Sequence, residues 1–267
     1  MGLNNKLHRL KSILKEMGSV LIAYSGGADS TFLLKVALDS LGGKVLAVTA
    51  DSLTYPKEEL AFAKKITRGL GVRHKIIRTK ELKDRRFLNN PITRCYFCKS
   101  QLFKTLKEIA VKKRLKFIAD ASNLSDKLDF RPGDKAKKDF KVRSPLAEAG
   151  FSKEDIRSSS KSLGLVTWDK PSLACLASRI PYGQRITPAL LKRIDKGEYF
   201  LKNIGFKQLR LRHHNHLCRI EVPLQDIPAL VKRRNLVVAG LKRLGYNYIT
   251  LDLEGFRSGS LNEVIKK

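Results

Sequence analysis

The glycine-rich stretch Ser25–Ser30 (SGGADS) is well suited to bind an anion in this 267-residue chain. Two adjacent glycines, Gly26 and Gly27, allow a tight turn and let the backbone approach a ligand closely. Where such a turn leads into a helix, its N–H groups and the N-terminus of the helix together form a cradle for phosphate. The hydroxyl groups of Ser25 and Ser30 add further donors. We therefore predict a phosphate-binding loop, although neither GxxxxGK[ST] nor GxGxxG is present.

Three of the four cysteines lie in contexts that favour metal binding or catalysis. Cys95 and Cys98 form a Cys-x-x-Cys motif between an arginine and a lysine. Cys175 lies in the aperiodic segment 166–186, between an alanine and a leucine, and is either a functional or a buried structural cysteine. Neighbouring cations and a helix N-terminus favour the thiolate, which binds metals and attacks electrophiles. The N-terminal stretch shows no export signal, so a metal site, a cluster or a redox pair is expected rather than disulfides. Cys218 lies inside a predicted strand and is expected to belong to the core.

The elements that position the loop alternate between strand and helix. Short apolar runs predict parallel strands, and apolar side chains at helical spacing predict the helices between them. Strands are predicted at residues 20–24, 44–49, 72–77 and 115–119, and helices at 3–17, 31–41, 56–70, 100–113 and 152–164. This alternation predicts an α/β fold with a doubly wound parallel sheet. Residues 125–141 are polar and are expected to form a loop.

Asp51 and Ser52 follow the second predicted strand, at the edge of the sheet where ligands bind in open α/β folds. They either contact a bound nucleotide or only cap the local backbone. The segment 120–123 (DASN) follows the fourth strand in the same way.

The C-terminal part has a different character. Residues 166–186 break all periodicity and contain three prolines or glycines, so a loop that carries functional groups is expected. After it, helices are predicted at 187–203 and 225–244, and strands at 207–213, 217–222 and 246–251. We predict two domains, residues 1–165 and a small α+β domain with its loop, residues 166–267.

Alternation in the strand 207–213 places Arg210 and Arg212 on one face. Because guanidinium groups match phosphate oxygens, this face is either a phosphate clamp or a solvated basic surface. The nearby histidines are interpreted as hairpin residues rather than metal ligands; they are His213, His214 and His216.

The net charge of +29 attracts phosphate-bearing partners such as ATP, a phosphorylated substrate or tRNA, but it does not choose among them. No apolar run is long enough for a transmembrane helix, and a cytoplasmic location is expected.

Several long blocks of the sequence resemble one family. SGGADS is the signature of the PP-loop ATP pyrophosphatases, and nearly the whole chain resembles the LarE-type ATP-dependent sulfur transferases, which make the precursor of the nickel-pincer nucleotide. The blocks that carry this resemblance are SGGADS, RCYFCKSQLF, RPGDKA, VRSPLAEAGFSKEDIR, TWDKPSLACLASRIPYGQRIT and LDLEGFRSGSLN. The segment 120–123 departs from the family, which tends to have DGTN there.

The resemblance implies a fold, a reaction and a set of site residues. ATP, with Mg²⁺, would adenylylate a carboxylate of a pyridinium mononucleotide, and a sulfur nucleophile would then displace AMP to give a thiocarboxylate. The resemblance assigns catalysis to Asp29 and Cys175. It assigns ATP binding to the loop residues Ser25, Gly26, Gly27, Asp29 and Ser30, with Asp51 and Ser52 nearby. It assigns the phosphate of the substrate to Ser178, Arg179, Arg210 and Arg212, together with Glu198.

The source of sulfur divides this family. Some members sacrifice the sulfur of one cysteine, at the position of Cys175, whereas others hold a [4Fe–4S] cluster on three cysteines. Because Cys95 and Cys98 accompany Cys175, the resemblance implies the cluster type, reloaded by sulfide or another sulfur donor. It also implies a homo-oligomer. The alternative is a PP-loop tRNA thiolase, which the charge favours; a non-catalytic nucleic-acid-binding module is disfavoured by the intact loop.

Overall fold

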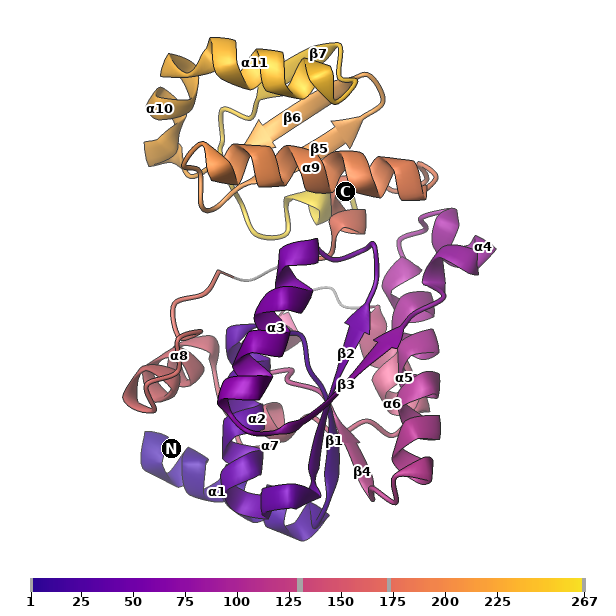
Figure 1. Cartoon of the computed structure of the whole chain (residues 1–267), viewed down its shortest axis with the longest axis vertical. Coiled ribbons are helices and arrows are strands. Elements are labelled where there is room, and N and C mark those ends of the chain that lie inside the picture. The colour runs from indigo at the N-terminus through magenta and orange to yellow at the C-terminus, as the bar shows by residue number, and fades with distance from the viewer. Residues whose placement is uncertain (1, 129–131, 172–173, 266–267) are drawn as a thin grey trace. The chain divides into compact units, whose positions relative to one another are not determined.

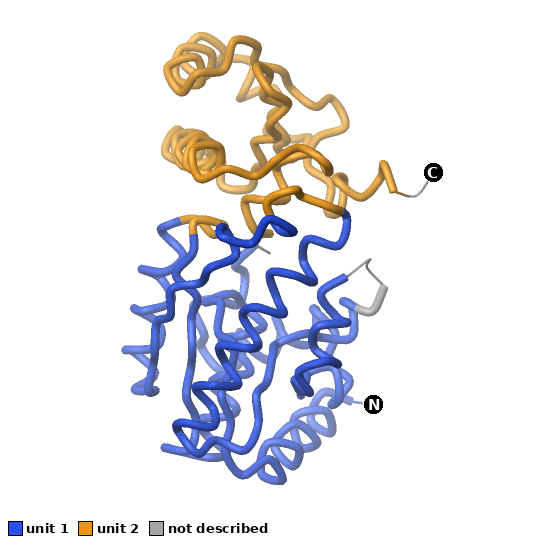
Figure 2. Tube along the Cα trace, turned by 90° about the vertical axis from the view of Figure 1, so that its right-hand side faces the viewer, with its two compact units in different colours: residues 1–52, 57–87, 92–173 blue, residues 53–56, 88–91, 174–267 orange. Residues whose placement is uncertain are grey.

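The computed structural model describes residues 2–128, 132–171 and 174–265, which form two compact units. The first unit takes in residues 1–52, 57–87 and 92–173, and the second takes in residues 53–56, 88–91 and 174–267 (Figure 2).

The first unit is built on a four-stranded parallel sheet with the order β3-β2-β1-β4 (Figure 1). Its strands are β1 Val20–Ala23, β2 Val45–Asp51, β3 Arg73–Arg78 and β4 Phe117–Ala119. Val20 is in register with both Val45 and Phe117, so β1 is a central strand. All four carboxyl ends therefore lie at one edge of the sheet, as the predicted doubly wound α/β fold requires.

Helices cover both faces of this sheet. They are α1 Leu3–Met17, α2 Ala28–Leu41, α3 Lys57–Gly69, α4 Arg85–Leu88, α5 Arg94–Lys112, α6 Gly133–Asp139, α7 Pro145–Glu148 and α8 Lys153–Ser162. Successive residues of β1 serve different cores: Val20 and Ile22 pack with α1 and α2, whereas Leu21 packs with Phe103 and Leu106 of α5. This alternation follows from the two-residue period of a strand and confirms a sheet buried on both faces.

Two predictions for this unit were wrong in their details. Residues 125–141, expected to form a loop, contain helix α6, whose Ala136 packs into the core beside α5. The helix predicted at 100–113 begins at Arg94, so Cys95 and Cys98 lie at its N-terminal end. By contrast, the cap of α8 is as the sequence indicates, because Ser152 and Asp155 form a reciprocal capping box.

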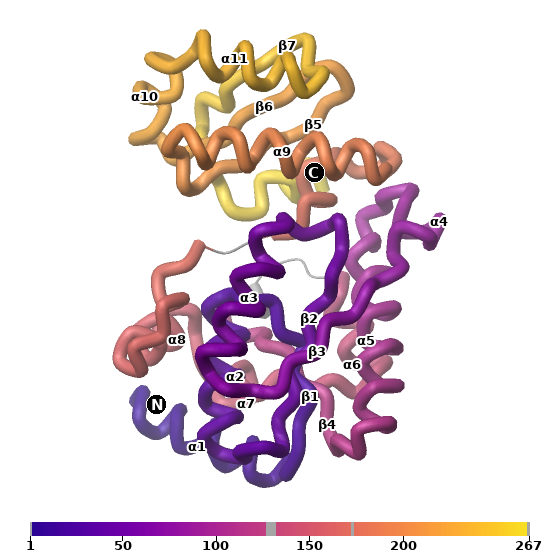
Figure 3. Tube along the Cα trace, viewed as in Figure 1, coloured from indigo at the N-terminus to yellow at the C-terminus, as the bar shows by residue number. Residues whose placement is uncertain are grey.

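The second unit is a small α+β structure (Figure 3). Its elements are α9 Pro188–Asn203, β5 Arg210–His214, β6 Leu217–Glu221, α10 Ile227–Lys232, α11 Arg234–Arg243 and β7 Tyr248–Leu251. Strand β6 is central, antiparallel to β5 and parallel to β7. The helix predicted at 225–244 is instead two helices separated at Arg233. Cys218 is fully buried in this unit's core, as predicted.

Short 3-10 helices complete the two units; they are Gly42–Lys44, Glu81–Lys83, Leu124–Leu128, Leu176–Arg179, Leu224–Asp226 and Ser260–Ile265. None of the helices in the described part of the chain is long and apolar enough to cross a membrane.

Candidate active site

The phosphate-binding loop connects β1 to α2. Gly26 has a φ of 77°, a conformation that side chains rarely adopt, and a Cβ there would lie only 3.1 Å from the Cβ of Ala63. The hydroxyl oxygens of Ser25 and Ser30 are 3.0 Å apart, and the N–H of Gly27 donates to Ser25 Oγ over 3.3 Å. The loop thus gathers hydroxyl groups and backbone N–H groups at the N-terminus of a 14-residue helix, an arrangement that can bind phosphate.

Two carboxylates and an amide lie together beside this loop. Asn123, in the segment after β4, donates from Nδ2 to Asp29 Oδ2 over 3.2 Å, and its N–H donates to Asp126 Oδ2 over 3.1 Å. Burial, and then the nearby carboxylate of Asp126, raise the pKa of Asp29 above the usual value for aspartate. The Oδ1 atom of Asn123 is buried and accepts no hydrogen bond within the described structure. These oxygens are ligands of the kind that Mg²⁺ prefers.

A polar network continues from this group along the segment after β4. Asp120 accepts hydrogen bonds from Ser122 Oγ over 2.7 Å and from Ser144 Oγ over 2.6 Å. The ammonium of Lys137 lies 3.0 Å from Ser122 Oγ and 2.9 Å from Asp134 Oδ1. The network fixes the segment in which the sequence departs from the DGTN pattern.

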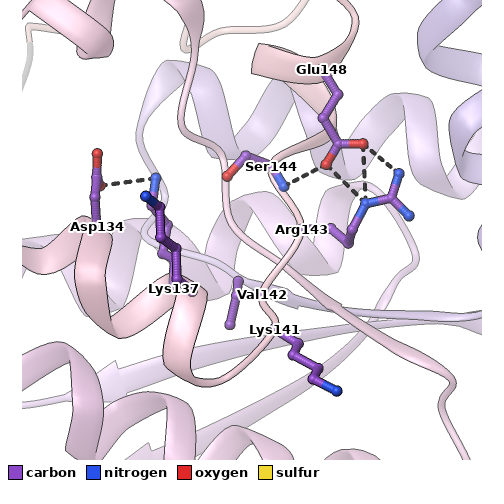
Figure 4. A pocket seen from close by; sticks show the side chains of 8 residues that line it. Asp134, Lys137, Lys141, Val142, Arg143, Ser144 and Glu148 are labelled. Atoms are coloured by element: carbon purple, nitrogen blue, oxygen red, sulfur yellow. Dashed lines mark hydrogen bonds and ion pairs between the residues drawn. The ribbon is translucent and has the colours of Figure 1, made fainter.

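Two adjoining cavities of about 270 and 380 Å³ lie along this network. Figure 4 shows the larger, with Lys137 paired to Asp134, and Glu148 bonded to Arg143 and to the backbone of Ser144. The smaller is bounded by Ser122 and Asn123, so the cavities adjoin the segment that contacts Asp29.

Asp51 and Ser52 lie at the carboxyl end of β2, the strand next to β1. The hydroxyl of Ser52 donates to Glu81 Oε1, which is itself buried. Both residues are therefore on the edge of the sheet from which the phosphate-binding loop also emerges.

The cysteines divide between the two units. Cys95 and Cys98 are half-buried and separated by three positions at the N-terminal end of α5, so they share one side of the helix. Cys175 is also half-buried, and it precedes the 3-10 helix Leu176–Arg179 in the second unit. Among the residues that the structure describes, no three His, Cys, Asp or Glu side chains are grouped closely enough to hold a metal ion.

Arginines dominate the polar core of the second unit. Arg179 pairs with Glu198 through two hydrogen bonds of 2.7 and 3.1 Å, and Arg212 pairs with Glu221 over 2.8 and 3.0 Å. Burial lowers the pKa of Arg179, but the Glu198 carboxylate outweighs it, so the net pKa is raised. The alternative of a solvated basic strand face was wrong, because Arg210 is only 8% exposed.

Arg210 differs from its neighbours because it pairs with no carboxylate among the described residues. Its guanidinium lies 4.5 Å from the centre of the Phe256 ring and donates to the carbonyl of Arg257 over 3.2 Å. Burial, followed by the positive charges of Arg212 and Arg179, lowers its pKa to about 10. An anion bound here would relieve this repulsion.

The segment around Cys175 is held by Arg179. Its Nη1 donates to Ala174 O over 3.0 Å and to Ser178 Oγ over 3.0 Å, and Arg212 Nη1 donates to Ser178 O over 2.6 Å. Four of the predicted phosphate-site residues are thus joined in one network: Ser178, Arg179, Glu198 and Arg212. Sequence reasoning did not identify Glu221 as a counter-ion of the arginines. Its signal is its position on β6, where it is in register with Arg210 of β5.

Sequence reasoning also missed Asn123 and Asp126 as partners of Asp29, and Lys170 as a contact of the loop. The signal for Asn123 and Asp126 is their place just after β4, at the edge of the sheet where the loop lies. Lys170 has a weaker signal, within the block TWDKPSLAC.

Comparisons with known proteins agree with this geometry. Residues 19–96, which contain the phosphate-binding loop and Cys95, match the family model of queuosine biosynthesis protein QueC. An uncharacterised protein of Synechocystis sp. is 42% identical over 99% of this chain and 100% of its own length. An uncharacterised protein of Methanocaldococcus jannaschii is 28% identical over 95% of this chain and 98% of its own.

A named relative settles the family. The pyridinium-3,5-bisthiocarboxylic acid mononucleotide synthase of Lactiplantibacillus plantarum is 36% identical over 99% of this chain and 96% of its own length. Identity at this level over nearly the full length of both chains shows the family. This chain belongs to the LarE family of that synthase.

Proposed function

We propose that this chain is an ATP-dependent sulfur transferase that converts a carboxylate of a pyridinium mononucleotide into a thiocarboxylate, within nickel-pincer nucleotide biosynthesis. The similarity to the Lactiplantibacillus plantarum synthase over nearly the full length of both chains carries this proposal. The reaction begins with activation, since a carboxylate is a poor electrophile until one of its oxygens becomes part of a good leaving group.

In the first half-reaction, a carboxylate oxygen of the substrate attacks the α-phosphorus of ATP. A new P–O bond forms, the α–β P–O bond breaks, and pyrophosphate leaves. The N–H of Gly27 and the hydroxyls of Ser25 and Ser30 bind the departing phosphates. Asp29, held by Asn123, fits a role as an Mg²⁺ ligand, and the ion would neutralise charge on the phosphates. Asp51 and Ser52 are proposed to contact the nucleotide.

In the second half-reaction, a sulfur nucleophile attacks the activated carbonyl carbon, and the bond to AMP breaks. Arg210 and Arg212 hold the phosphate of the substrate, with Ser178, Arg179 and Glu198 supporting them. We assign the nucleotide chemistry to residues 1–165 and the substrate and sulfur chemistry to residues 166–267.

Cys95, Cys98 and Cys175 are proposed to hold a [4Fe–4S] cluster. Thiolates are the usual cluster ligands, and all three cysteines are half-buried. A cluster with three thiolates leaves one iron open, which suits the transfer of an extra sulfur supplied by sulfide or another donor. The chain is proposed to be cytoplasmic and to form a homo-oligomer. Light scattering would measure the mass of the oligomer.

Iron and acid-labile sulfide per chain, measured after purification and reconstitution without oxygen, test the cluster. We expect about four of each, lost in Cys95→Ala and Cys175→Ala but kept in the control Cys218→Ser. If no cluster forms, the three-cysteine assignment is wrong, and mass loss at Cys175 after turnover would identify a sacrificial donor.

The net charge of +29 favours a second candidate, a PP-loop tRNA thiolase. Release of AMP and pyrophosphate with the pyridinium mononucleotide, but not with tRNA, is the result expected here. Tight tRNA binding with a steep salt dependence, together with AMP release on tRNA alone, would favour the thiolase instead.

A further inference from the structure

Lys170 connects the segment after α8 to the phosphate-binding loop. Its Nζ donates to the carbonyl oxygen of Gly26 over 3.1 Å and pairs with Glu59 Oε2 over 2.7 Å. The same ammonium lies 3.8 Å from the centre of the Phe62 ring. Only 15% of the side chain is exposed, so the ammonium is held at the loop by these three contacts together.

The backbone of Lys170 is held as firmly as its side chain. Its N–H donates to Thr167 O over 3.1 Å, and its carbonyl accepts from Arg157 Nη2 of α8 over 3.2 Å. Thr167 is fully buried, and Leu165 packs in the core of the first unit. The backbone from which the Lys170 side chain extends is therefore fixed within this unit.

The contact with Gly26 determines where the next N–H points. In a trans peptide the carbonyl and the N–H of one peptide group point in opposite directions, and the described chain has no cis peptide. The carbonyl of Gly26 points to Lys170, so the N–H of Gly27 points the other way, to Ser25 Oγ at 3.3 Å. That is the side on which the hydroxyls of Ser25 and Ser30 gather.

This peptide is the one in the loop with the least resistance to rotation. Glycines flank it on both sides, so no Cβ restricts the rotation that would exchange its carbonyl and its N–H. After such a rotation, a carbonyl oxygen would face the phosphates in place of a donor. The ammonium of Lys170 opposes this rotation, because it stabilises the carbonyl on the outer side of the loop.

We propose that Lys170 is a positioning residue that holds the Gly26–Gly27 peptide in the orientation that binds phosphate. The loop then binds ATP well only while the segment 166–171 is docked on the first unit. The same chain reaches Cys175 five residues later, so ATP affinity is linked to the segment that leads to the proposed sulfur-transfer cysteine. The part of this proposal that concerns ATP rests on the proposed function, whereas the peptide orientation does not.

Selective labelling tests the peptide orientation without any ligand. In protein labelled with [1-¹³C]glycine and [¹⁵N]glycine, only Gly–Gly peptides give coupled ¹³C–¹⁵N signals, and the sequence has two, Gly26–Gly27 and Gly42–Gly43. In Lys170→Met we expect the Gly27 signal to shift or broaden and the Gly43 signal to stay unchanged. Lys170→Arg, which keeps a cation, restores the first signal.

The affinity for ATP, measured by calorimetry, tests the consequence. Loss of a charge-assisted hydrogen bond corresponds to about tenfold to a hundredfold, so we expect Lys170→Met to bind ATP more weakly by that factor. The control is Lys35→Met, which removes an equal charge from an exposed pair with Asp39 on α2. If Lys170→Met does not fold, Lys170→Ala with added propylammonium replaces it, and the amine should recover the Gly27 signal.

An unchanged Gly27 signal with weaker ATP binding would overturn the proposal, because Lys170 would then contact the phosphates directly. An altered signal with unchanged ATP affinity would overturn it as well. If the wild-type chain binds no ATP, the proposed function fails, while the labelling experiment still decides the orientation of the peptide.

Discussion

Asn123 and Asp29 are 94 positions apart in the chain, yet the amide of Asn123 donates to the carboxylate of Asp29 over 3.2 Å. This hydrogen bond joins the segment after β4 to the first turn of α2, and it holds Asp29 near a second carboxylate, that of Asp126. Burial and then Asp126 raise the pKa of Asp29, so the ionised form costs stability in the ligand-free protein.

Asp29→Asn should therefore stabilise the ligand-free chain at neutral pH. The folded pKa lies above the unfolded value of 3.8, so the penalty is absent below pH 3.8, grows as the pH rises from there to the folded pKa, and is complete above the folded pKa. Thermal unfolding midpoints measured in a pH series should be higher for Asp29→Asn than for the unsubstituted chain at pH 7. This difference should shrink as the pH falls. A midpoint that falls at pH 7 would contradict this account.

The same substitution should reduce ATP-dependent activation on the order of a hundredfold or more, as loss of a preorganised charge at a phosphate site does. Pyrophosphate exchange into ATP measures this, with Asp39→Asn, an exposed residue of α2, as the control. Higher stability together with lower activity would identify Asp29 as a residue kept for function.

Glu221→Gln should be among the most destabilising polar substitutions. It leaves Arg212, which is 3% exposed, without its counter-ion in the core of the second unit, and loss of one partner of a buried pair costs about 3–5 kcal/mol. Urea unfolding measures the free energy of unfolding. The matched control is Glu254→Gln, whose carboxylate is 75% exposed and pairs with Arg257, and which should cost at most about 1 kcal/mol.

Arg210→Gln should affect the substrate more than the fold. Arg210 makes no ion pair among the described residues, and burial, followed by the neighbouring arginines, lowers its pKa to about 10. Its removal should leave the free energy of unfolding nearly unchanged and raise the KM for the pyridinium mononucleotide about tenfold or more, as loss of a charged hydrogen bond does. An unchanged KM would remove Arg210 from the phosphate site.

The four thiols should separate into two classes. Cys95, Cys98 and Cys175 are half-buried, whereas Cys218 is fully buried and burial raises its pKa to about 12. Cluster-free, reduced protein should therefore react quickly with a disulfide reagent at three thiols, and at the fourth only after unfolding in urea. Cys218→Ser should remove the reaction that requires urea. If this variant instead lost one of the three fast reactions, Cys218 would not be the protected thiol.

Local rules account for the helix caps and predicted the sheet of the first unit well. Ser152 and Thr187 each accept a hydrogen bond from the first turn of their helix, as their residue types and the acidic or proline residues that follow them indicate. The strands of the parallel sheet were predicted because their apolar runs are short and lie between helical patterns. Such features depend on neighbours within about four positions.

What the sequence did not predict depends on distant contacts. Helix α6 is mostly charged and has no apolar pattern of its own. Its place is fixed by Ala136, which packs against α5. The two helices are separated at Arg233. The guanidinium of Arg233 donates to the carbonyl of Ile204 and lies over the ring of Phe206. Neither partner is visible in the local sequence.

The candidate site shows the same division. The residue types of the loop predicted an anion cradle, and alternation along β5 placed Arg210 and Arg212 on one face. Excluding a solvated surface needed the burial of the strand, and the pairing of Arg212 with Glu221 is likewise not visible in the sequence; the phosphate clamp itself stays a prediction. The roles of the individual site residues stay predictions until the variants above are measured.

The second unit takes two tetrapeptides from the middle of the other unit's sequence, residues 53–56 and 88–91. These short pieces satisfy backbone groups in the C-terminal part: Thr54 O accepts from Leu176 N over 2.7 Å, and Asn90 O accepts from Gly183 N over 2.9 Å. A gene fragment that begins at residue 174 would lack these acceptors. The C-terminal part is thus not a cassette that gene fusion could append or exchange whole.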